Sequence, residues 1–305
     1  MRGASTRRAL PALWQPQARH EALAVLREHG DDAKVVAGAT AFAIAWKAGL
    51  LSATHLVSCT RIADLHGIEL LPPDQGRDAG ALRIGAAATL QQVERHPLIR
   101  RHASVLAATM GVVANLRVRN AATMGGNLAE ADYSSDPPGV LAALGATVRL
   151  QSAAGSRWVE LADFFVDYYQ TSIRPDELLT DVELPVLGGD WRGTYLKHTT
   201  RSVDDRTCLG VAAFVRIGSD GNCAGLRLAV VGAAPTPLRL PDVENQFAGV
   251  TPGSDELKDL AQRYASTADP ISDIRGSAEH RRHLIRVLIP RAIRAAHAGQ
   301  EVSGP

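Results

Sequence analysis

The chain has 305 residues, 46% of them hydrophobic, and its 33 basic and 32 acidic side chains leave a formal net charge of +1. This length and composition suit one large globular domain, or two to three smaller ones with separate cores. Because the charges are balanced along the chain, nucleic acid and anionic membranes are not expected as partners. No stretch approaches the length of a membrane span, and the basic start lacks the apolar core of a secretory signal, so neither is expected.

The cysteines indicate the redox environment. Cys59, Cys208 and Cys223 stand far apart and form no C-x-x-C pair. This spacing argues against a disulfide framework and against an iron–sulfur or zinc site within this chain. We therefore expect a reducing, cytoplasmic location and no metal bound by the chain itself.

The N-terminal region has the pattern of a parallel strand pair. Apolar residues recur at helical spacing over 18–29, and Gly30 follows where a helix C-cap glycine is expected. The sequence then predicts a strand over 33–38, a helix over 39–49 and a strand over 54–60. A strand, loop, helix and strand in this order favour a parallel pair.

The next region, from about Arg61, has an antiparallel pattern. A strand near 82–85 leads into a helix with Thr89 at its N-cap and Gln92 in a capping-box position, and Pro97 is expected to end that helix. A hairpin is predicted about 153–156, and 177–185 follows as another strand.

The last region begins near Gly193. Two strands are predicted about an Asp220-Gly221 turn, followed by two helices within 254–297 that are separated at Asp269-Pro270. The whole chain is therefore predicted to be α+β, in three parts.

Two glycine segments could bind a ligand. The first, Ala37 to Thr40, lies between a strand and a helix, where exposed N–H groups favour an anion; an ordinary turn with Thr40 as N-cap is the alternative. The second, Thr123 to Asn127, is followed by further polar residues and is predicted to be a loop whose backbone approaches a ligand. A polar Ω-loop closed by its own Asx turns is the alternative.

The blocks "KVVAGAT", "LRIGAAATLQQVERHPLIR", "NLRVRNAATMGGNLAEADYSSDPP" and "GATVRLQSAAGSRWVELADFF" carry a resemblance. Together they resemble the FAD-binding medium subunit of the molybdenum hydroxylases, the family of xanthine dehydrogenase and aerobic carbon monoxide dehydrogenase. The blocks "YLKHTTRSVDD" and "SDIRGSAEHRRHLIRVLIPRAI" resemble its C-terminal flavoprotein domain. The blocks follow the family order over nearly the whole chain, which favours ligand binding over the alternatives for both glycine segments.

The resemblance implies a fold and a domain division. The expected fold is α+β, with a two-subdomain FAD-binding domain of the PCMH type followed by a C-terminal antiparallel sheet with helices. The expected parts are an N-terminal subdomain over 1–60, a second FAD-binding subdomain over 61–188, and a C-terminal domain over 189–305.

The resemblance also implies non-covalent FAD held by both glycine segments. Asp136 matches a family acidic residue that binds ribose or ribityl hydroxyls, and Lys197 matches a lysine near the flavin edge in some members, with an exposed strand lysine as the alternative. The first segment matches a loop near the pyrophosphate, and the second a loop toward phosphate and flavin. Their matching residues are Val36, Ala37, Gly38, Ala39 and Thr40, and Thr123, Met124, Gly125, Gly126 and Asn127.

Two positions depart from the family pattern. Ala39 replaces a usual second glycine, and Ala41 stands where an acidic or polar residue is common. If Ala39 takes a positive φ, the strain is about 1–2 kcal/mol, against about 12 kcal/mol for a ligand held at nanomolar affinity. FAD binding is therefore expected to be weakened at most.

The function implied is that of an electron-transfer subunit with no catalytic side chain of its own. Molybdopterin on a large partner subunit would oxidise the substrate, [2Fe-2S] clusters on a small subunit would deliver the electrons, and an external acceptor would receive them. The assembly expected is a heterotrimer or its dimer. Two alternatives are a non-catalytic assembly subunit that has lost FAD and a self-contained flavin dehydrogenase. Flavin colour tests the first, and a substrate site of its own would favour the second.

Overall fold

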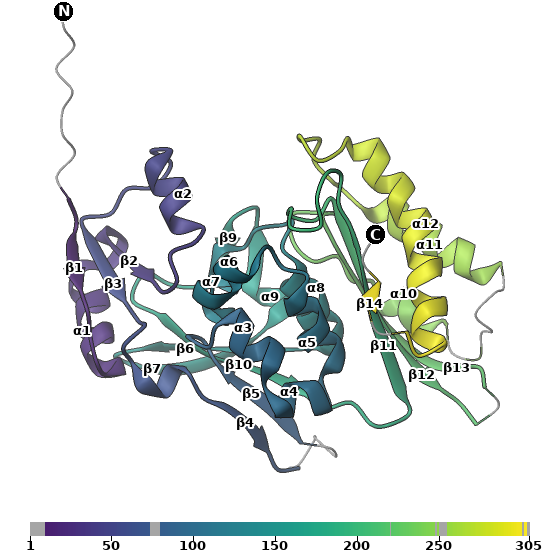
Figure 1. Cartoon of the computed structure of the whole chain (residues 1–305), viewed down its shortest axis with the longest axis horizontal. Coiled ribbons are helices and arrows are strands. Elements are labelled where there is room, and N and C mark those ends of the chain that lie inside the picture. Colours follow the sequence, from purple (N-terminus) through teal and green to yellow (C-terminus); the bar gives the residue numbers. More distant parts are fainter. Residues whose placement is uncertain are drawn as a thin grey trace, which may run out of the picture.

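The computed structural model describes residues 10–73, 80–219, 221–247, 249, 255–300 and 302–303. The three larger sheets of the described chain follow one another along the long axis of the molecule, in the order of the chain (Figure 1), and a fourth sheet is a two-stranded pair within residues 165–171. The structure mixes helices and sheets, as the sequence predicts.

The N-terminal sheet is parallel, with strand order β1-β3-β2. The predicted strand pair is confirmed as β2 and β3, and the predicted first helix ends at Gly30, whose φ of 47° suits glycine. The short strand β1 was not predicted because its three residues are all exposed and give no burial pattern. The elements are β1 (Ala12–Trp14), α1 (Arg19–His29), η1 (Gly30–Asp32), β2 (Ala33–Val36), α2 (Phe42–Lys47), β3 (His55–Ser58) and η2 (Ala63–Leu65).

The central sheet has five antiparallel strands in the order β4-β5-β10-β6-β7. The antiparallel prediction is confirmed for this sheet, and the hairpin about 153–156 is the β6–β7 turn. The strands are β4 (Ile68–Leu71), β5 (Ala81–Gly85), β6 (Thr147–Ser152), β7 (Gly155–Glu160) and β10 (Leu178–Pro185), with α9 (Leu161–Phe164), β8 (Phe165–Asp167) and β9 (Gln170–Thr171) between β7 and β10.

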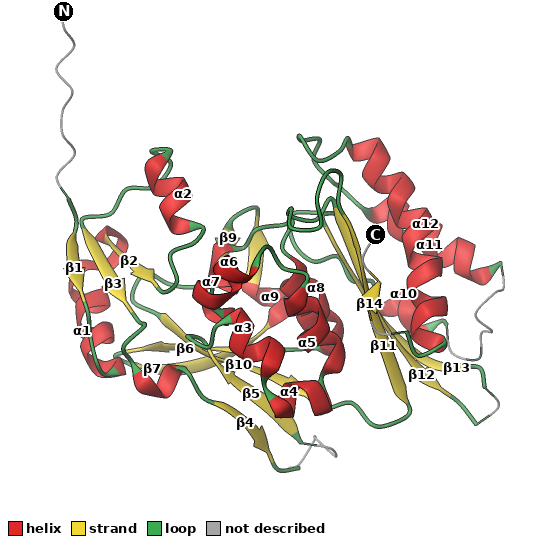
Figure 2. Ribbon diagram, viewed as in Figure 1, coloured by secondary structure: helices red, strands yellow, loops and turns green. Residues whose placement is uncertain are grey.

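A group of short helices between β5 and β6 lies beside this sheet (Figure 2). The capping box is confirmed: the Thr89 side chain accepts from the Gln92 N–H at 3.1 Å, and the Gln92 side chain accepts from the Thr89 N–H at 2.8 Å. The helix stops at Arg95, and Pro97 opens the next one, because proline suits the first helical position. The helices are α3 (Leu90–Arg95), α4 (Pro97–His102), α5 (Ser104–Gly111), α6 (Leu116–Ala121), α7 (Met124–Glu130) and α8 (Asp136–Leu144).

The C-terminal sheet, in the order β13-β12-β11-β14, has helices on both faces: α11 and α12 pack on one side and α8 on the other. The two predicted strands and the two predicted helices are confirmed, although Asp220 of the predicted turn lies outside the described residues. The elements are β11 (Trp191–His198), β12 (Leu209–Ile217), β13 (Cys223–Val231), α10 (Pro241–Asn245), α11 (Glu256–Thr267), α12 (Ala278–His297) and β14 (Val302–Ser303).

Strand β12 joins two hydrophobic cores. Successive side chains of a strand point to opposite faces, and here Ala212 and Phe214 belong to the core shared with the central region, whereas Val211, Ala213 and Val215 belong to the core under α11 and α12. The predicted boundaries at residues 60 and 188 fall between elements, and the division into three domains stays a prediction.

Candidate functional site

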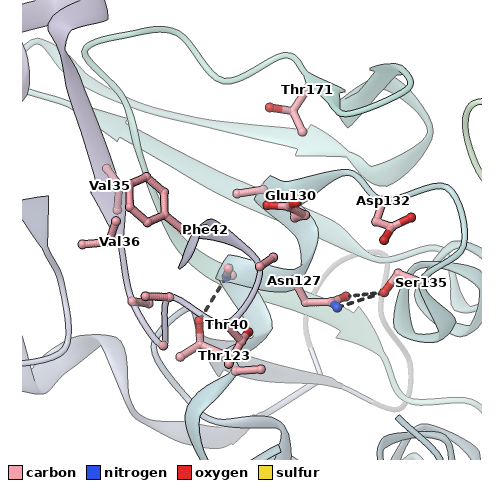
Figure 3. Close-up of a pocket in the computed structure, with 18 of the residues that line it drawn as sticks. Val35, Val36, Thr40, Phe42, Thr123, Asn127, Glu130, Asp132, Ser135 and Thr171 are labelled. Atoms are coloured by element: carbon pink, nitrogen blue, oxygen red, sulfur yellow. Dashed lines mark hydrogen bonds between the residues drawn. The ribbon is translucent and has the colours of Figure 1, made fainter. Parts of the chain in front are cut away.

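A cavity of about 760 Å³ lies where the three regions meet. Its wall comes from β2 and the loop after it, from the stretch 113–136 beside the central sheet, and from residues 197–206 and 274–275 of the C-terminal region. Figure 3 shows side chains of the first two segments around the space, among them Phe42, Asn127 and Asp132. The predicted site residues Val36, Ala37, Gly38, Ala39, Thr40, Thr123, Gly125, Gly126, Asn127, Asp136 and Lys197 all line this cavity.

The first glycine segment is pressed against the helix that precedes the second. A Cβ atom placed on Gly38 would lie 1.7 Å from the Ala121 carbonyl oxygen and 2.9 Å from the Ala122 nitrogen. Only glycine fits this approach, because both neighbours are backbone atoms that no rotamer change can move. Gly38 therefore brings the two segments together on one side of the cavity.

The backbone after Gly38 offers a row of hydrogen-bond donors. Within the described chain, the N–H groups of residues 38–42 donate to no acceptor. Ala39 has a φ of 53°, the left-handed value considered from the sequence. Successive N–H groups around such a residue form a concave donor set that suits phosphate oxygens. The alternative of Thr40 as N-cap is wrong, because α2 begins after Ala41 and has no side-chain cap.

Replacing Ala39 by glycine should stabilise the chain. A non-glycine residue at positive φ is strained by about 1–2 kcal/mol, and glycine removes this strain. Glycine also raises the conformational entropy of the unfolded chain, which offsets part of the benefit, so we expect the free energy of unfolding to rise by about 0.5–1 kcal/mol. Urea unfolding of the flavin-free chain measures this change in the free energy of unfolding. Ala131 has a φ of 48° outside the cavity wall, so Ala131→Gly is the matched control for strain alone. A less stable Ala39→Gly variant would contradict the strain argument.

The second glycine segment is not the loop that the sequence predicts. It forms the first turn of α7, with the Thr123 side chain accepting from the Gly126 N–H at 3.1 Å, and neither glycine has a positive φ. Gly125 is required by packing, because an added Cβ would lie 2.5 Å from the Ala86 Cβ. Tertiary packing thus outweighs the low helix propensity of two adjacent glycines. Met124, also in the predicted set, is buried in the core.

A polar contact closes the wall beyond α7. The Asn127 amide donates to the Ser135 hydroxyl at 2.9 Å, and that hydroxyl donates back to the amide oxygen at 3.1 Å (Figure 3). This pair fixes the turn between α7 and α8. The Ω-loop alternative is wrong for the glycine segment, because residues 124–130 are helical, but an Asx turn follows the helix: Asp132 Oδ1 accepts from the Ser134 N–H at 3.0 Å.

Asp136 and Lys197 form a buried ion pair at the cavity wall. Lys197 Nζ lies 2.9 Å from Asp136 Oδ2 and also donates to the Val112 carbonyl at 2.7 Å, while the Tyr195 hydroxyl donates to Asp136 Oδ1 at 2.6 Å. The alternative of an exposed strand lysine is wrong, because Lys197 is 6% exposed. Burial raises the pKa of Asp136, while Lys197 and Tyr195 favour its ionised form. Its contact with ribose or ribityl hydroxyls stays a prediction.

A second charged group on the wall was not predicted from the sequence. Asp132 is 7% exposed; its Oδ2 lies 2.6 Å from Arg206 Nη1, and its Oδ1 accepts from the Ser134 hydroxyl at 2.9 Å. Burial raises the pKa of Glu130. The Arg206 charge lowers this pKa, and the Asp132 charge raises it further. Asp132 and Glu130 lie within the block "NLRVRNAATMGGNLAEADYSSDPP", so their position close to the second glycine segment could have identified them as site residues. Their partner Arg206 comes from another region, and local patterns carry no information about it.

The family comparisons agree with this geometry. A family described as the FAD binding domain in molybdopterin dehydrogenase matches residues 7–187, and one described as the CO dehydrogenase flavoprotein C-terminal domain matches residues 194–296. The chain belongs to the FAD-binding family of molybdopterin dehydrogenases. The expected fold, an FAD-binding domain followed by a CO dehydrogenase flavoprotein C-terminal domain, is thereby confirmed.

Relatives of this FAD-binding family match over most of their length. The glyceraldehyde dehydrogenase medium chain of Sulfolobus acidocaldarius is 30% identical over 90% of this chain and 94% of its own. The carbon monoxide dehydrogenase medium chain of Afipia carboxidovorans is 31% identical over 93% and 96%. The solved carbon monoxide dehydrogenase of Hydrogenophaga pseudoflava matches with a TM-score of 0.88 at 26% identity, over 95% of this chain and 98% of that one.

Two features are absent from the described residues. No group of three or more His, Cys, Asp or Glu side chains in the described part of the chain is placed to hold a metal ion. None of the described helices combines the length and apolar character needed to cross a membrane.

Proposed function

We propose that this FAD-binding medium subunit transfers electrons from [2Fe-2S] clusters of a partner subunit to an external acceptor. The observation that carries the proposal is the single cavity that unites both glycine segments with Asp136 and Lys197. When bound, the isoalloxazine ring of FAD supplies the redox chemistry. The residues of the chain bind and orient the cofactor, so no side chain is required as nucleophile or base.

Each part of the wall has a proposed task. The free N–H groups of residues 38–42 would hold the pyrophosphate. Thr123 and Asn127, with Gly125 and Gly126 allowing close approach, would line the path toward the flavin. The Asp136–Lys197 pair would form the wall near the ribityl chain and flavin edge. These donors and charges suit a flavin dinucleotide, because they place anion-binding and polar groups around one cavity of about 760 Å³.

The proposed partners follow from the relatives. Several are named as medium chains or as a subunit of a complex, including the 6-hydroxypseudooxynicotine dehydrogenase complex of Paenarthrobacter nicotinovorans. We propose a large subunit with molybdopterin and a small subunit with [2Fe-2S] clusters, assembled as a heterotrimer or its dimer. A cytoplasmic location stays an expectation.

The alternative of an assembly subunit without FAD was motivated by Ala39 and Ala41. Ala39 adopts the positive φ without a glycine, and the neighbouring N–H groups remain available. This favours retained FAD binding. A purified chain without yellow colour, folded by circular dichroism, would favour the assembly role instead.

The lone chain is expected to bind FAD but to accept no electrons from the substrate of the complex. Its wall offers binding groups, and the described residues hold no metal-ligand group for substrate oxidation. The test expresses the chain alone and together with its partner subunits, and follows flavin reduction by substrate without oxygen. The control is reduction of the lone chain by dithionite, which should bleach its flavin fully. Substrate reduction of the lone chain at the rate of the full complex would favour the self-contained dehydrogenase.

A further inference from the structure

Tyr133 connects the cavity wall to the C-terminal region. Its neighbours Asp132 and Ser134 line the cavity, whereas the Tyr133 side chain packs toward the loop between α11 and α12 and is 8% exposed. Its hydroxyl donates to Asp273 Oδ2 at 2.5 Å, and its carbonyl accepts from the Gly232 N–H at 2.9 Å. Both ends of this residue are therefore held by the C-terminal region.

Asp273 is the centre of this connection. Arg275 Nη1 lies 2.7 Å from Oδ2, and Arg281 Nη2 lies 2.6 Å from Oδ1. The Arg275 N–H also donates to Oδ1 at 2.8 Å. One carboxylate thus gathers two guanidinium groups, a backbone amide and the Tyr133 phenol. Asp273 lies in the motif "SDIRGSAEHRR", which resembles the C-terminal flavoprotein domain. The proposed function assigns no role to this motif.

Arg281 anchors this centre to the sheet. It is completely buried and donates to the Cys208 carbonyl at 2.8 Å and the Gly232 carbonyl at 3.1 Å. Its guanidinium carbon lies 5.7 Å from the centre of the Tyr133 ring, within cation–π range. The Gly232 N–H also donates to the Tyr133 carbonyl. The Tyr133 phenol, the Asp273 carboxylate, the Arg281 guanidinium and Gly232 after the strand therefore form one closed network.

The protonation states keep the network intact. Burial opposes ionisation of Asp273, but the hydrogen bonds from Tyr133 and Arg275 together with the Arg281 charge hold its pKa well below the usual value. Burial and the Asp273 carboxylate raise the pKa of Tyr133. The phenol therefore remains a donor and the carboxylate an acceptor at neutral pH.

The same loop reaches the cavity. Ile274 and Arg275 follow Asp273 directly and line the wall. Asp273 therefore fixes two parts of the wall at once: the turn 132–136 through Tyr133, and the C-terminal side through Arg275.

We propose that Asp273 is a positioning residue for the bound flavin, because it fixes the Tyr133 turn and the Arg275 loop on two sides of the cavity. The proposal rests on the proposed function, since it requires FAD in this cavity. Asp273 itself need not contact the cofactor.

Glu244 provides a matched control for a purely structural role. It is 2% exposed, and it accepts from Arg239 at 2.6 Å and from the Tyr264 hydroxyl at 2.9 Å, so it combines carboxylate, guanidinium and phenol as Asp273 does. It lies in α10, which contributes no residue to the cavity wall. A loss of stability alone should therefore be similar for Asp273 and Glu244 variants.

The test compares Asp273→Asn and Tyr133→Phe with Glu244→Gln and Tyr264→Phe in the full chain. The measurements are the FAD dissociation constant, the visible circular dichroism of the bound flavin, and thermal unfolding without FAD. We expect the first two variants to weaken FAD binding by about tenfold and to alter the flavin signal, because each loses a charge-assisted hydrogen bond that holds the wall. The two controls should lower thermal stability while leaving affinity and signal unchanged. The double variant at 133 and 273 should lose no more affinity than the Asp273 variant alone.

Wild-type affinity and flavin signal in both Asp273→Asn and Tyr133→Phe would overturn the positioning role. If Asp273→Asn does not fold, Tyr133→Phe decides, because it removes only one hydroxyl. Equal losses in the Glu244 and Tyr264 controls would also overturn it, since they would show a general effect of stability. A wild-type chain that binds no FAD would instead refute the proposed function, and with it this inference.

Discussion

Gly38→Ala should purify with little or no FAD while keeping most of its secondary structure. The added Cβ would fall 1.7 Å from the Ala121 carbonyl oxygen and 2.3 Å from the carbonyl carbon, both backbone atoms. The two segments must then separate, which moves the N–H groups of residues 38–42 away from the α7 side of the cavity. A misplaced set of phosphate donors loses several hydrogen bonds to a charged group, each contributing about 1.5–3 kcal/mol.

The measurement is FAD content per chain, by absorbance after gel filtration. Gly67→Ala is the control, because nothing lies within 4 Å of its added Cβ and its φ is not positive. Full flavin content in Gly38→Ala would show that the two segments need not touch for the cofactor to bind.

Lys197→Met should destabilise the chain by about 3–5 kcal/mol at neutral pH, the usual effect of leaving one buried charge without its partner. Asp136 is 3% exposed, and methionine preserves much of the lysine volume, so loss of charge dominates over loss of packing. The Tyr195 hydroxyl remains as a donor but carries no charge.

The loss should depend on pH. In the folded chain the pKa of Asp136 is already raised by burial above its usual 3.8, and removing Lys197 removes the main opposing influence. A raised folded-state pKa gives stability that is complete below the unfolded value and is lost as pH rises through the folded value. Urea unfolding should therefore show a smaller penalty at about pH 5 than at about pH 8.

Two further variants test the cause of that penalty. Lys197→Met combined with Asp136→Asn should recover part of the stability, because no buried charge is left. Lys258→Met is the exposed control: both side chains of its pair with Asp255 are mostly exposed to solvent, and we expect little change. An equal penalty at both pH values would attribute the loss to packing.

Local sequence signals predicted much of the fold. The capping box at Thr89 and Gln92, the C-cap at Gly30 and the alternating strands of the β6–β7 hairpin each depend on residues close in sequence. The short exposed strand β1 and the helix α7 escaped prediction. The first has no burial pattern, and the second depends on the packing of Gly125 against Ala86.

The resemblance predicted the backbone segments that line the site, but it did not predict all of the charged side chains there. Both glycine segments and the Asp136–Lys197 pair lie on one cavity, as the shared family match implied. The partners Arg206 and Asp273 come from distant positions, and a single sequence gives no sign of which distant side chains meet. The approach of Gly38 to Ala121 is equally non-local.

Strand β12 has a consequence for how the chain tolerates change. Its residues from Leu209 to Val215 are all buried, and alternate ones belong to different cores, so this part of the strand has no solvent side on which substitutions are neutral. A substitution that shifts its backbone disturbs the packing of α8 and of α12 together. Because β12 is shared by both cores, we expect the C-terminal region and the region before it to unfold as one cooperative unit, rather than separately on either side of the family boundary near residue 190.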